Sequence, residues 1–214
     1  MNIRIGDHIR AVLIDHDDTG VATIQTKWPQ HIYVALTYYG KVLTEAELRL
    51  HWGKPLHEMI CIIYETDDVQ AALRNIRSCH DRFPKSLFPT TVPFLQRMRA
   101  QGKLTGLVTA TSAESFGFDL RLVGFPIALL DYVQTADDTQ IHKPDPCVFD
   151  PAIAWLAKHG IARHEALYVG VSLNDMRAAM GAGLQFIGVE TGLFTGEEFQ
   201  QHGTHSVPDL GHLL

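Results

Sequence analysis

Residues 13–19 read Leu-Ile-Asp-His-Asp-Asp-Thr and continue an apolar run that begins at Ala11. A short apolar run bounded by polar residues is typical of a buried strand, and parallel sheets bind ligands at the carboxyl ends of their strands. Asp15 and Asp17 lie two residues apart at this end, so both side chains can reach one site just beyond the sheet. A polar turn is the ordinary alternative, because aspartate is a common turn former.

The acidic residues of this segment also have an electrostatic consequence. Carboxylates as close in sequence as Asp15, Asp17 and Asp18 repel one another strongly unless a cation lies among them. A hard divalent cation with oxygen ligands, Mg²⁺ above all, suits such a cluster. The segment therefore predicts a cation site at a strand end.

Similar strand ends recur along the chain. Apolar runs at 107–108, 166–169 and 186–189 also read as strands, and helical segments fill the gaps between them. This alternation predicts an α/β fold with a mostly parallel sheet. Thr109 and Gly170 follow two of these runs directly, so we expect residues from three strand ends to converge on one site with Asp15.

Residues 20–85 differ from the rest because they look helical and contain few strand-like runs. Thr44 and Glu47 have the spacing of a capping box that opens a helix. An insertion of about 65 residues exceeds the usual length of a crossover connection. We therefore predict a helical cap domain at residues 20–85, inserted into a core domain formed by residues 1–19 and 86–214. A long first crossover is the alternative.

Three further segments carry groups suited to chemistry. The hydroxyl-rich loop from Thr109 to Ser112 can offer N–H and O–H groups to an anion. Lys143 lies beside prolines before a helix, where its ammonium can neutralise charge on a phosphoryl group. Asp175 lies near the start of a helix that follows a strand. Each has an ordinary interpretation as well: N-capping by Ser112, a solvated loop lysine, and helix capping by Asp175.

Taken together, the order and spacing of these segments resemble the four signature motifs of the haloacid dehalogenase superfamily of hydrolases. Residues 52–56 also resemble the helical cap of its phosphoglycolate phosphatase and β-phosphoglucomutase branch. The resemblance implies a Rossmann-like parallel-sheet core with a helical cap inserted after the first strand. The motif residues are Asp15, Asp17 and Thr19 for D-x-D-x-T, Thr109 for the strand-end Ser/Thr, Lys143 for K-P-x-P, and Gly170 and Asp175 for G-D-x-x-x-D.

The resemblance also implies a role for each catalytic residue. Asp15 attacks phosphorus and forms an aspartyl-phosphate, which is covalent catalysis. Asp17 protonates the leaving oxygen and then deprotonates the attacking water. Thr109 and Lys143 hold the phosphoryl oxygens. The implied cofactor is Mg²⁺, with Asp15, Asp17 and Asp175 as its ligands, Asp17 through its main-chain carbonyl.

Substrate contacts are implied in both predicted domains. Thr19 and Ala110 would bind substrate in the core, and the cap would contribute Arg49, His51, Trp52 and Lys54. Packing inside the cap is the alternative for Trp52, and simple solvent exposure is the alternative for Lys54.

The chain departs from the family pattern at three positions. Val171 stands where the family has a metal-binding acid directly after the glycine, so we expect weaker metal affinity. Asp18 replaces the usual glycine of the first motif and adds negative charge near the site. Ala110 replaces a frequent asparagine, a smaller change because a backbone N–H can still serve there.

These residues favour a magnesium-dependent phosphohydrolase that acts on a small phosphorylated metabolite through an aspartyl-phosphate. Val171 motivates an alternative, a degenerate member that binds a phosphorylated ligand with little or no hydrolysis. A metal-free 2-haloacid dehalogenase is a further alternative. The dehalogenases lack a second aspartate in the first motif, and this chain has Asp17.

Composition narrows the range of partners. The 214 residues are 46% hydrophobic and 20% charged, with a formal net charge of -6. Nothing here suggests the basic face that nucleic acid requires. The 3 cysteines form no C-x-x-C pair, and neither a signal peptide nor an apolar run long enough for a membrane span is apparent. We expect a cytoplasmic monomer or homodimer whose partner is a small phosphorylated substrate.

Overall fold

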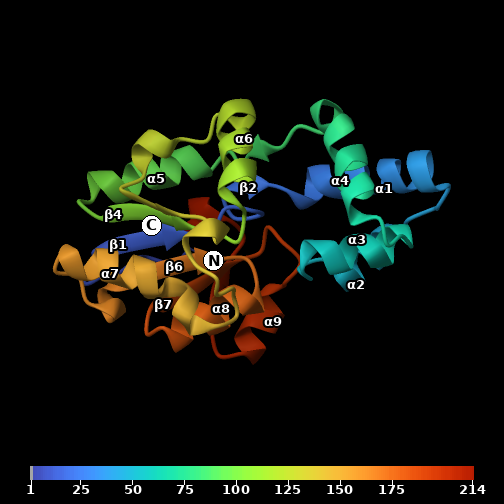
Figure 1. The fold of residues 1–214 in the computed structure, drawn as a ribbon. Helices are drawn as coiled ribbons and strands as arrows, with labels where there is room; N and C mark the ends of the chain where they lie inside the picture. The colour runs from blue at the N-terminus through green and yellow to red at the C-terminus, as the bar shows by residue number, and fades with distance from the viewer. Residues whose placement is uncertain (1) are drawn as a thin grey trace. The chain divides into compact units, whose positions relative to one another are not determined.

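A parallel sheet forms the centre of the larger of two compact units in this computed structural model, which describes residues 2–214 (Figure 1). The sheet has 6 strands in the order β5-β4-β1-β6-β7-β8, and each neighbouring pair is parallel. This confirms the predicted Rossmann-like α/β fold with a mostly parallel sheet. The strands are β1 (Ala11–Ile14), β4 (Leu104–Val108), β5 (Tyr132–Gln134), β6 (Ala166–Gly170), β7 (Gln185–Val189) and β8 (Ser206–Val207).

Helices cover both faces of this sheet. Figure 1 shows α5 (Thr91–Ala100) and α6 (Ala113–Val123) on one face, with α7 (Asp150–Lys158) and α8 (Leu173–Gly181) on the other. The short helix α9 (Gly196–Gln201) lies between β7 and β8 in the chain. The short 3-10 helices are η1 (His80–Arg82), η2 (Ile127–Leu129), η3 (Ala136–Asp138), η4 (Pro146–Phe149), η5 (Arg163–Glu165) and η6 (Leu210–His212).

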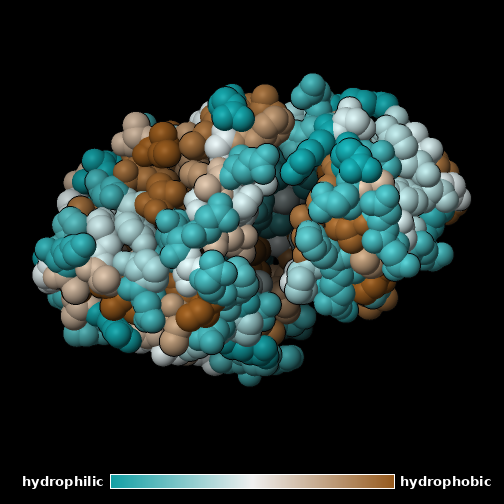
Figure 2. Space-filling model, viewed as in Figure 1, coloured by the Kyte–Doolittle hydropathy of each residue, from teal (hydrophilic) through white to brown (hydrophobic). Residues whose placement is uncertain are grey.

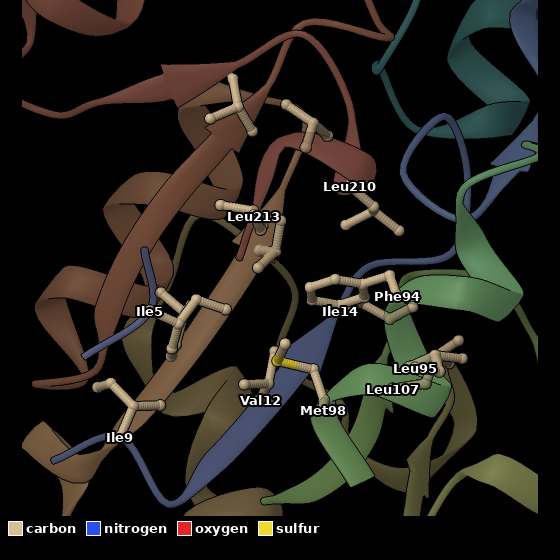
Figure 3. Close-up of a cluster of buried hydrophobic side chains, with 14 of the residues drawn as sticks. Ile5, Ile9, Val12, Ile14, Phe94, Leu95, Met98, Leu107, Leu210 and Leu213 are labelled. Carbon is tan, nitrogen blue, oxygen red and sulfur yellow. The ribbon is translucent and has the colours of Figure 1, made fainter. Parts of the chain in front are cut away.

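The central strand β1 divides its buried side chains between two apolar clusters. Val12 and Ile14 belong to the cluster that includes Phe94 and Met98 of α5 (Figure 3), whereas Leu13 belongs to the cluster that includes residues of α7 and α8. Successive side chains of a strand point to opposite faces, so one apolar run contributes to both cores. Because β1 is buried on both sides, its carboxyl end is fixed in position.

The second unit, Thr23–Lys85, is helical. It contains α1 (Ile24–Tyr39), α2 (Glu45–His51), α3 (Leu56–Tyr64) and α4 (Val69–Ser78), which pack on one another through buried apolar side chains. The predicted capping box at the start of α2 is present: Thr44 Oγ1 accepts from the N–H of Glu47, and Glu47 accepts from the N–H of Thr44.

A short antiparallel pair stands where the chain leaves the sheet unit and where it returns. Strands β2 (Val21–Ala22) and β3 (Ser86–Leu87) pair directly on either side of the helical unit. The carbonyl of Gly20, just before β2, accepts a hydrogen bond from Thr91 Oγ1 at 2.8 Å. The two segments that connect the helical unit to the sheet unit are therefore held together by backbone hydrogen bonds.

The face of the molecule drawn in Figure 2 is mostly polar. On the face drawn in Figure 2, hydrophilic side chains surround several small apolar groups. Across residues 2–214, no helix is both long enough and apolar enough to span a membrane.

Candidate active site

Three neighbouring strands bring the site residues to one edge of the sheet. Asp15 directly follows β1, and its N–H donates to the carbonyl of Val169 in β6 at 2.9 Å. Thr109 directly follows β4, and its N–H donates to the carbonyl of Gln134 in β5 at 3.0 Å. The parallel ladder thus continues one residue past each strand, and backbone bonds fix both residues at the rim.

Lys143 lies among the acidic groups of this rim, with its side chain 8% exposed. Its Nζ atom lies 3.1 Å from Asp15 Oδ1 and 2.7 Å from Asp175 Oδ1. It also donates to the carbonyl of Val108 at 3.2 Å and to the hydroxyl of Tyr168 at 2.5 Å. Burial alone lowers the pKa of Lys143, but the two aspartates outweigh burial and raise it. The lysine is therefore a fixed cation at neutral pH.

Asp15 and Asp175 respond differently to the same lysine. Burial is the largest influence on Asp15 and raises its pKa to about 6, with Lys143 lowering it and the charges of Asp175 and Asp17 raising it further. Burial also raises the pKa of Asp175, but Lys143 and hydrogen bonds from Ser172 and the loop backbone hold it below its ordinary value. The structure thus stabilises the ionised form of Asp175 and leaves Asp15 short of positive charge.

The carboxylate of Asp175 is surrounded by donors from the chain itself. Its Oδ2 atom accepts from the N–H of Val171 at 3.2 Å, from the N–H of Ser172 at 3.0 Å and from the hydroxyl of Ser172 at 2.6 Å. Ser172 in turn accepts from the N–H of Asp175, which completes a capping box at the start of α8. Asp175 therefore both caps this helix and anchors Lys143, and its expected role as a metal ligand stays a prediction.

Asp17 is the most exposed of the three acidic residues, with a side chain 33% exposed. Its Oδ2 atom accepts a hydrogen bond of 2.5 Å from Thr111 Oγ1. The N–H of Thr111 donates to Thr109 Oγ1 at 3.0 Å, so the hydroxyl-rich loop after β4 connects to the first acidic motif. A partly exposed carboxylate held by a hydroxyl has the access and the orientation that proton transfer requires.

The turn after Asp17 needs an unusual backbone conformation. Asp18 has φ 56°, which lies in the left-handed region of backbone conformation. The glycine that is usual in this motif adopts this conformation without strain, and aspartate is among the other residues that tolerate it. Its N–H donates to the carbonyl of Val21 at 2.7 Å, and its carbonyl accepts from Thr191 Oγ1. Thr19 is 1% exposed, and its hydroxyl has no hydrogen-bond partner within residues 2–214.

Val171 packs as an apolar residue. Its side chain joins the cluster on one face of the sheet, and a β-carbon placed on Gly192 would lie 2.2 Å from its Cγ2 atom. The valine therefore lies directly against the Gly192 backbone and brings no oxygen to the site.

The remaining donors fit a hard divalent cation in their chemistry. They are carboxylate oxygens of Asp15, Asp17 and Asp175, and the ammonium of Lys143 lies within ion-pair distance of Asp15 and Asp175. Burial is the main cause of the raised pKa of Asp15, and the negative charges of Asp175 and Asp17 add to it. A bound cation would oppose both effects.

Two further residues contact the candidate site residues, and the sequence analysis did not name either one as a site candidate. Tyr168 is fully buried, and its hydroxyl donates to the carbonyl of Val108 at 2.8 Å while it accepts from Lys143. A tyrosine in an otherwise apolar strand just before Gly170 was the available signal. Thr111 was visible only as part of a hydroxyl-rich loop.

The remaining predicted residues lie in different parts of the structure. Ala110 lines a small cavity together with Thr109 and Lys143. Lys54 forms an exposed ion pair with Glu58 at 2.7 Å, and Trp52 packs edge-on against Trp28 with ring centres 6.0 Å apart. Arg49, His51, Trp52 and Lys54 all belong to the helical unit, and their contact with substrate stays a prediction.

Comparison with known proteins agrees with this architecture. Residues 12–189 match the family model described as haloacid dehalogenase-like hydrolase. A protein named pyrophosphatase PpaX, from Caldanaerobacter subterraneus subsp. tengcongensis, is 28% identical over 186 residues, which cover 85% of this chain and 82% of the relative. A phosphoglycolate phosphatase from Shigella boydii serotype 4 is 33% identical over 162 residues, which cover 71% of this chain and 59% of that relative.

Solved structures share the same fold. A haloacid dehalogenase-like hydrolase from Bacteroides fragilis superposes with a TM-score of 0.76 at 24% identity, covering 94% of this chain and 98% of that one. A protein named β-phosphoglucomutase, from Thermotoga maritima, gives 0.78 at 21% identity, with 94% and 95% coverage. The sheet and its acidic edge define a Rossmann-like α/β enzyme. The chain belongs to the haloacid dehalogenase-like hydrolase family, since the family match spans most of its length.

Proposed function

We propose that this hydrolase removes the phosphoryl group from a small phosphorylated metabolite through an aspartyl-phosphate on Asp15. The observation that carries the proposal is the position of Lys143, whose Nζ atom lies 3.1 Å from Asp15 Oδ1 at the end of β1. A carboxylate nucleophile attacking a phosphate ester must overcome repulsion between two anions, and a fixed ammonium beside it lowers that barrier.

The chemistry divides into two displacements. A carboxylate oxygen of Asp15 attacks phosphorus, and the bond from phosphorus to the leaving oxygen breaks while Asp17 gives that oxygen a proton. Water then attacks the phosphorus of the acyl phosphate, Asp17 takes the proton, and Asp15 is released together with inorganic phosphate. Thr111 holds Asp17 through the bond of 2.5 Å to its Oδ2 atom.

Groups around Asp15 and Asp17 would neutralise the negative charge of the phosphoryl group. Lys143 and the Thr109 loop meet the phosphoryl oxygens, and Asp175 keeps the lysine in place through the contact of 2.7 Å. Asp15 and the main-chain carbonyl of Asp17, with Asp175 nearby, would hold Mg²⁺, which supplies neutralising charge when bound. With valine at position 171, we propose that this ion is held more weakly than in relatives that have an acid there.

A panel assay tests the proposal. Release of inorganic phosphate would be measured from pyrophosphate, 2-phosphoglycolate, sugar phosphates and nucleotides at saturating Mg²⁺. The names of the related proteins motivate the first two substrates. We expect turnover of at least one substrate and its loss in Asp15→Asn. Folded protein that releases no phosphate from any substrate would contradict hydrolysis.

The packing of Val171 against Gly192 favours a second candidate function, binding of a phosphorylated ligand with little hydrolysis. The two candidates differ in one measurement. A hydrolase forms an acyl phosphate at Asp15 from a phosphate ester, whereas a binder retains the intact ester. Mass spectrometry of acid-quenched protein after mixing with an active ester separates them.

A further inference from the structure

The imidazole of His16 is buried in the sheet unit without a hydrogen bond. The residue is 0% exposed, and within residues 2–214 neither ring nitrogen has a hydrogen-bond partner. The ring lies between Phe116, with centres 5.2 Å apart, and Phe125, with centres 5.3 Å apart. A buried polar group without a hydrogen bond destabilises the fold, so such a group requires an explanation.

Two carboxylates lie near the nitrogens of this ring. Nδ1 lies 3.6 Å from Asp17 Oδ1, and Nε2 lies 3.9 Å from Asp119 Oδ2. Asp119 comes from α6 and is 3% exposed. One ligand atom from each of the three residues lies within 4.8 Å of the others. Atoms bound at about 2.0–2.2 Å to one metal ion lie about 3–4 Å apart. The three groups are therefore too far apart for good hydrogen bonds and close to the spacing of a metal site.

We propose that His16, Asp17 and Asp119 bind a divalent transition-metal ion, with Zn²⁺ preferred over Mg²⁺. An imidazole nitrogen combined with carboxylates suits Zn²⁺, whereas Mg²⁺ prefers oxygen ligands alone. One ring nitrogen binds the ion as neutral imidazole. The other ring nitrogen keeps its proton.

This site is separate from the cation expected beside Asp15, but it shares Asp17. A Zn²⁺ ion bound to the Asp17 carboxylate occupies the group that the proposed reaction uses for proton transfer. Zn²⁺ at this site therefore inhibits phosphate release even when Mg²⁺ is saturating. Binding itself does not rest on the proposed function, so the two ideas fail independently.

Calorimetric titration of the full-length, chelator-treated protein with Zn²⁺ in excess Mg²⁺ tests the site. The excess Mg²⁺ fills oxygen-only sites. We expect one Zn²⁺ per chain, with affinity reduced at least tenfold in both His16→Leu and Asp119→Asn. The matched control is His142→Leu, which removes an exposed histidine outside the set and keeps the wild-type affinity. Co²⁺ should give visible absorption bands that change in His16→Leu.

Two results of these titrations would overturn the proposed Zn²⁺ site. Wild-type protein that takes up no Zn²⁺ in excess Mg²⁺ overturns the proposal, as does unchanged affinity in Asp119→Asn. His16→Leu replaces an unsatisfied polar ring with an apolar side chain, so it should fold, and circular dichroism checks this. If it does not fold, Asp119→Asn and the Co²⁺ spectrum of the wild type still decide the question.

Discussion

The ammonium of Lys143 lies 2.7 Å from Asp175, closer than its distance of 3.1 Å from Asp15. The carboxylate of Asp175 is itself held by the loop that opens α8. The lysine is therefore positioned by the end of β6 and the start of α8, and it presents its charge to the end of β1. Loss of either partner should disturb the other.

Replacement of the lysine should affect both catalysis and stability. In Lys143→Met, Asp15 and Asp175 lose their shared cation, and removing one partner of a buried pair typically costs about 3–5 kcal/mol. We expect kcat to fall by about 10³-fold or more. Steady-state phosphate release and urea unfolding measure the two effects. Lys158→Met changes an exposed lysine of α7 and should alter neither. Normal turnover in Lys143→Met would contradict the proposed role.

The pKa of Asp15, about 6, predicts how activity depends on pH. The nucleophile must be ionised, so kcat/KM should fall as the pH drops through about 6 at limiting Mg²⁺. Asp175→Asn removes a charge that raises the pKa of Asp15, so the acid limb should move to lower pH in this variant. A pH profile of each protein checks the shift. An acid limb that does not move would show that Asp175 does not influence Asp15.

The same raised pKa makes the ionised nucleophile a cost to the fold. Below the unfolded pKa of about 4, the carboxyl of Asp15 is neutral in both states and the fold bears no such cost. The cost grows as the pH rises from about 4, and above about 6 the stability of the protonated form is lost. Asp15→Asn should therefore raise the free energy of unfolding at pH 7.5 by about 1–3 kcal/mol in the absence of divalent ions, and the melting temperature should rise with it. Differential scanning calorimetry at pH 4 and pH 7.5 tests the sign, and an equal effect at both values would contradict it.

Restoring the missing acid should strengthen metal binding. Val171→Asp adds a carboxylate at the position where the motif that this sequence resembles has one, and we expect the Mg²⁺ concentration for half-maximal activity to fall about tenfold. The cost is lost packing against Gly192, about 1 kcal/mol. Val171→Asn is the uncharged control of similar size. If both variants need the same Mg²⁺ concentration as the wild type, position 171 does not reach the ion.

We expect the hydroxyl of Thr111 to affect the reaction rate only through its hydrogen bond to Asp17. Thr111→Val removes the donor to Asp17 Oδ2 but keeps the shape of the side chain. We expect kcat to fall about 10-fold to 100-fold with little change in stability. Thr111→Ser should restore most of the loss, because it returns the hydroxyl. Equal rates for valine and serine at this position would exclude the hydrogen bond as the cause.

Much of this architecture could be predicted from the sequence because it depends on residues that are close together in the chain. The apolar run that ends at Asp15 is buried on both faces, and parallel strands place their carboxyl ends together. The capping box of Thr44 and Glu47 depends only on neighbours three residues apart. Such features require no knowledge of how distant segments meet.

Other features depend on contacts between distant residues. The hydroxyl of Tyr168 meets Lys143 only after β6 and the loop before α7 have folded together, and nothing in an apolar strand pattern identifies that contact. The same holds for Thr111 and Asp17, which lie 94 positions apart in the chain. Asp119 of α6 likewise comes beside His16 only in the folded chain, because the two residues are far apart in the sequence.

The β2–β3 pair affects how readily the helical insertion can change in length. Val21 pairs with Leu87 and Ala22 with Ser86, so the exit and re-entry points of the helical insertion are already joined by backbone hydrogen bonds. Closing a longer or shorter segment between fixed ends changes the free energy only slowly with its length. The helices of residues 23–85 can therefore be exchanged for others of different length while Asp15 and Lys143 keep their places in the sheet unit.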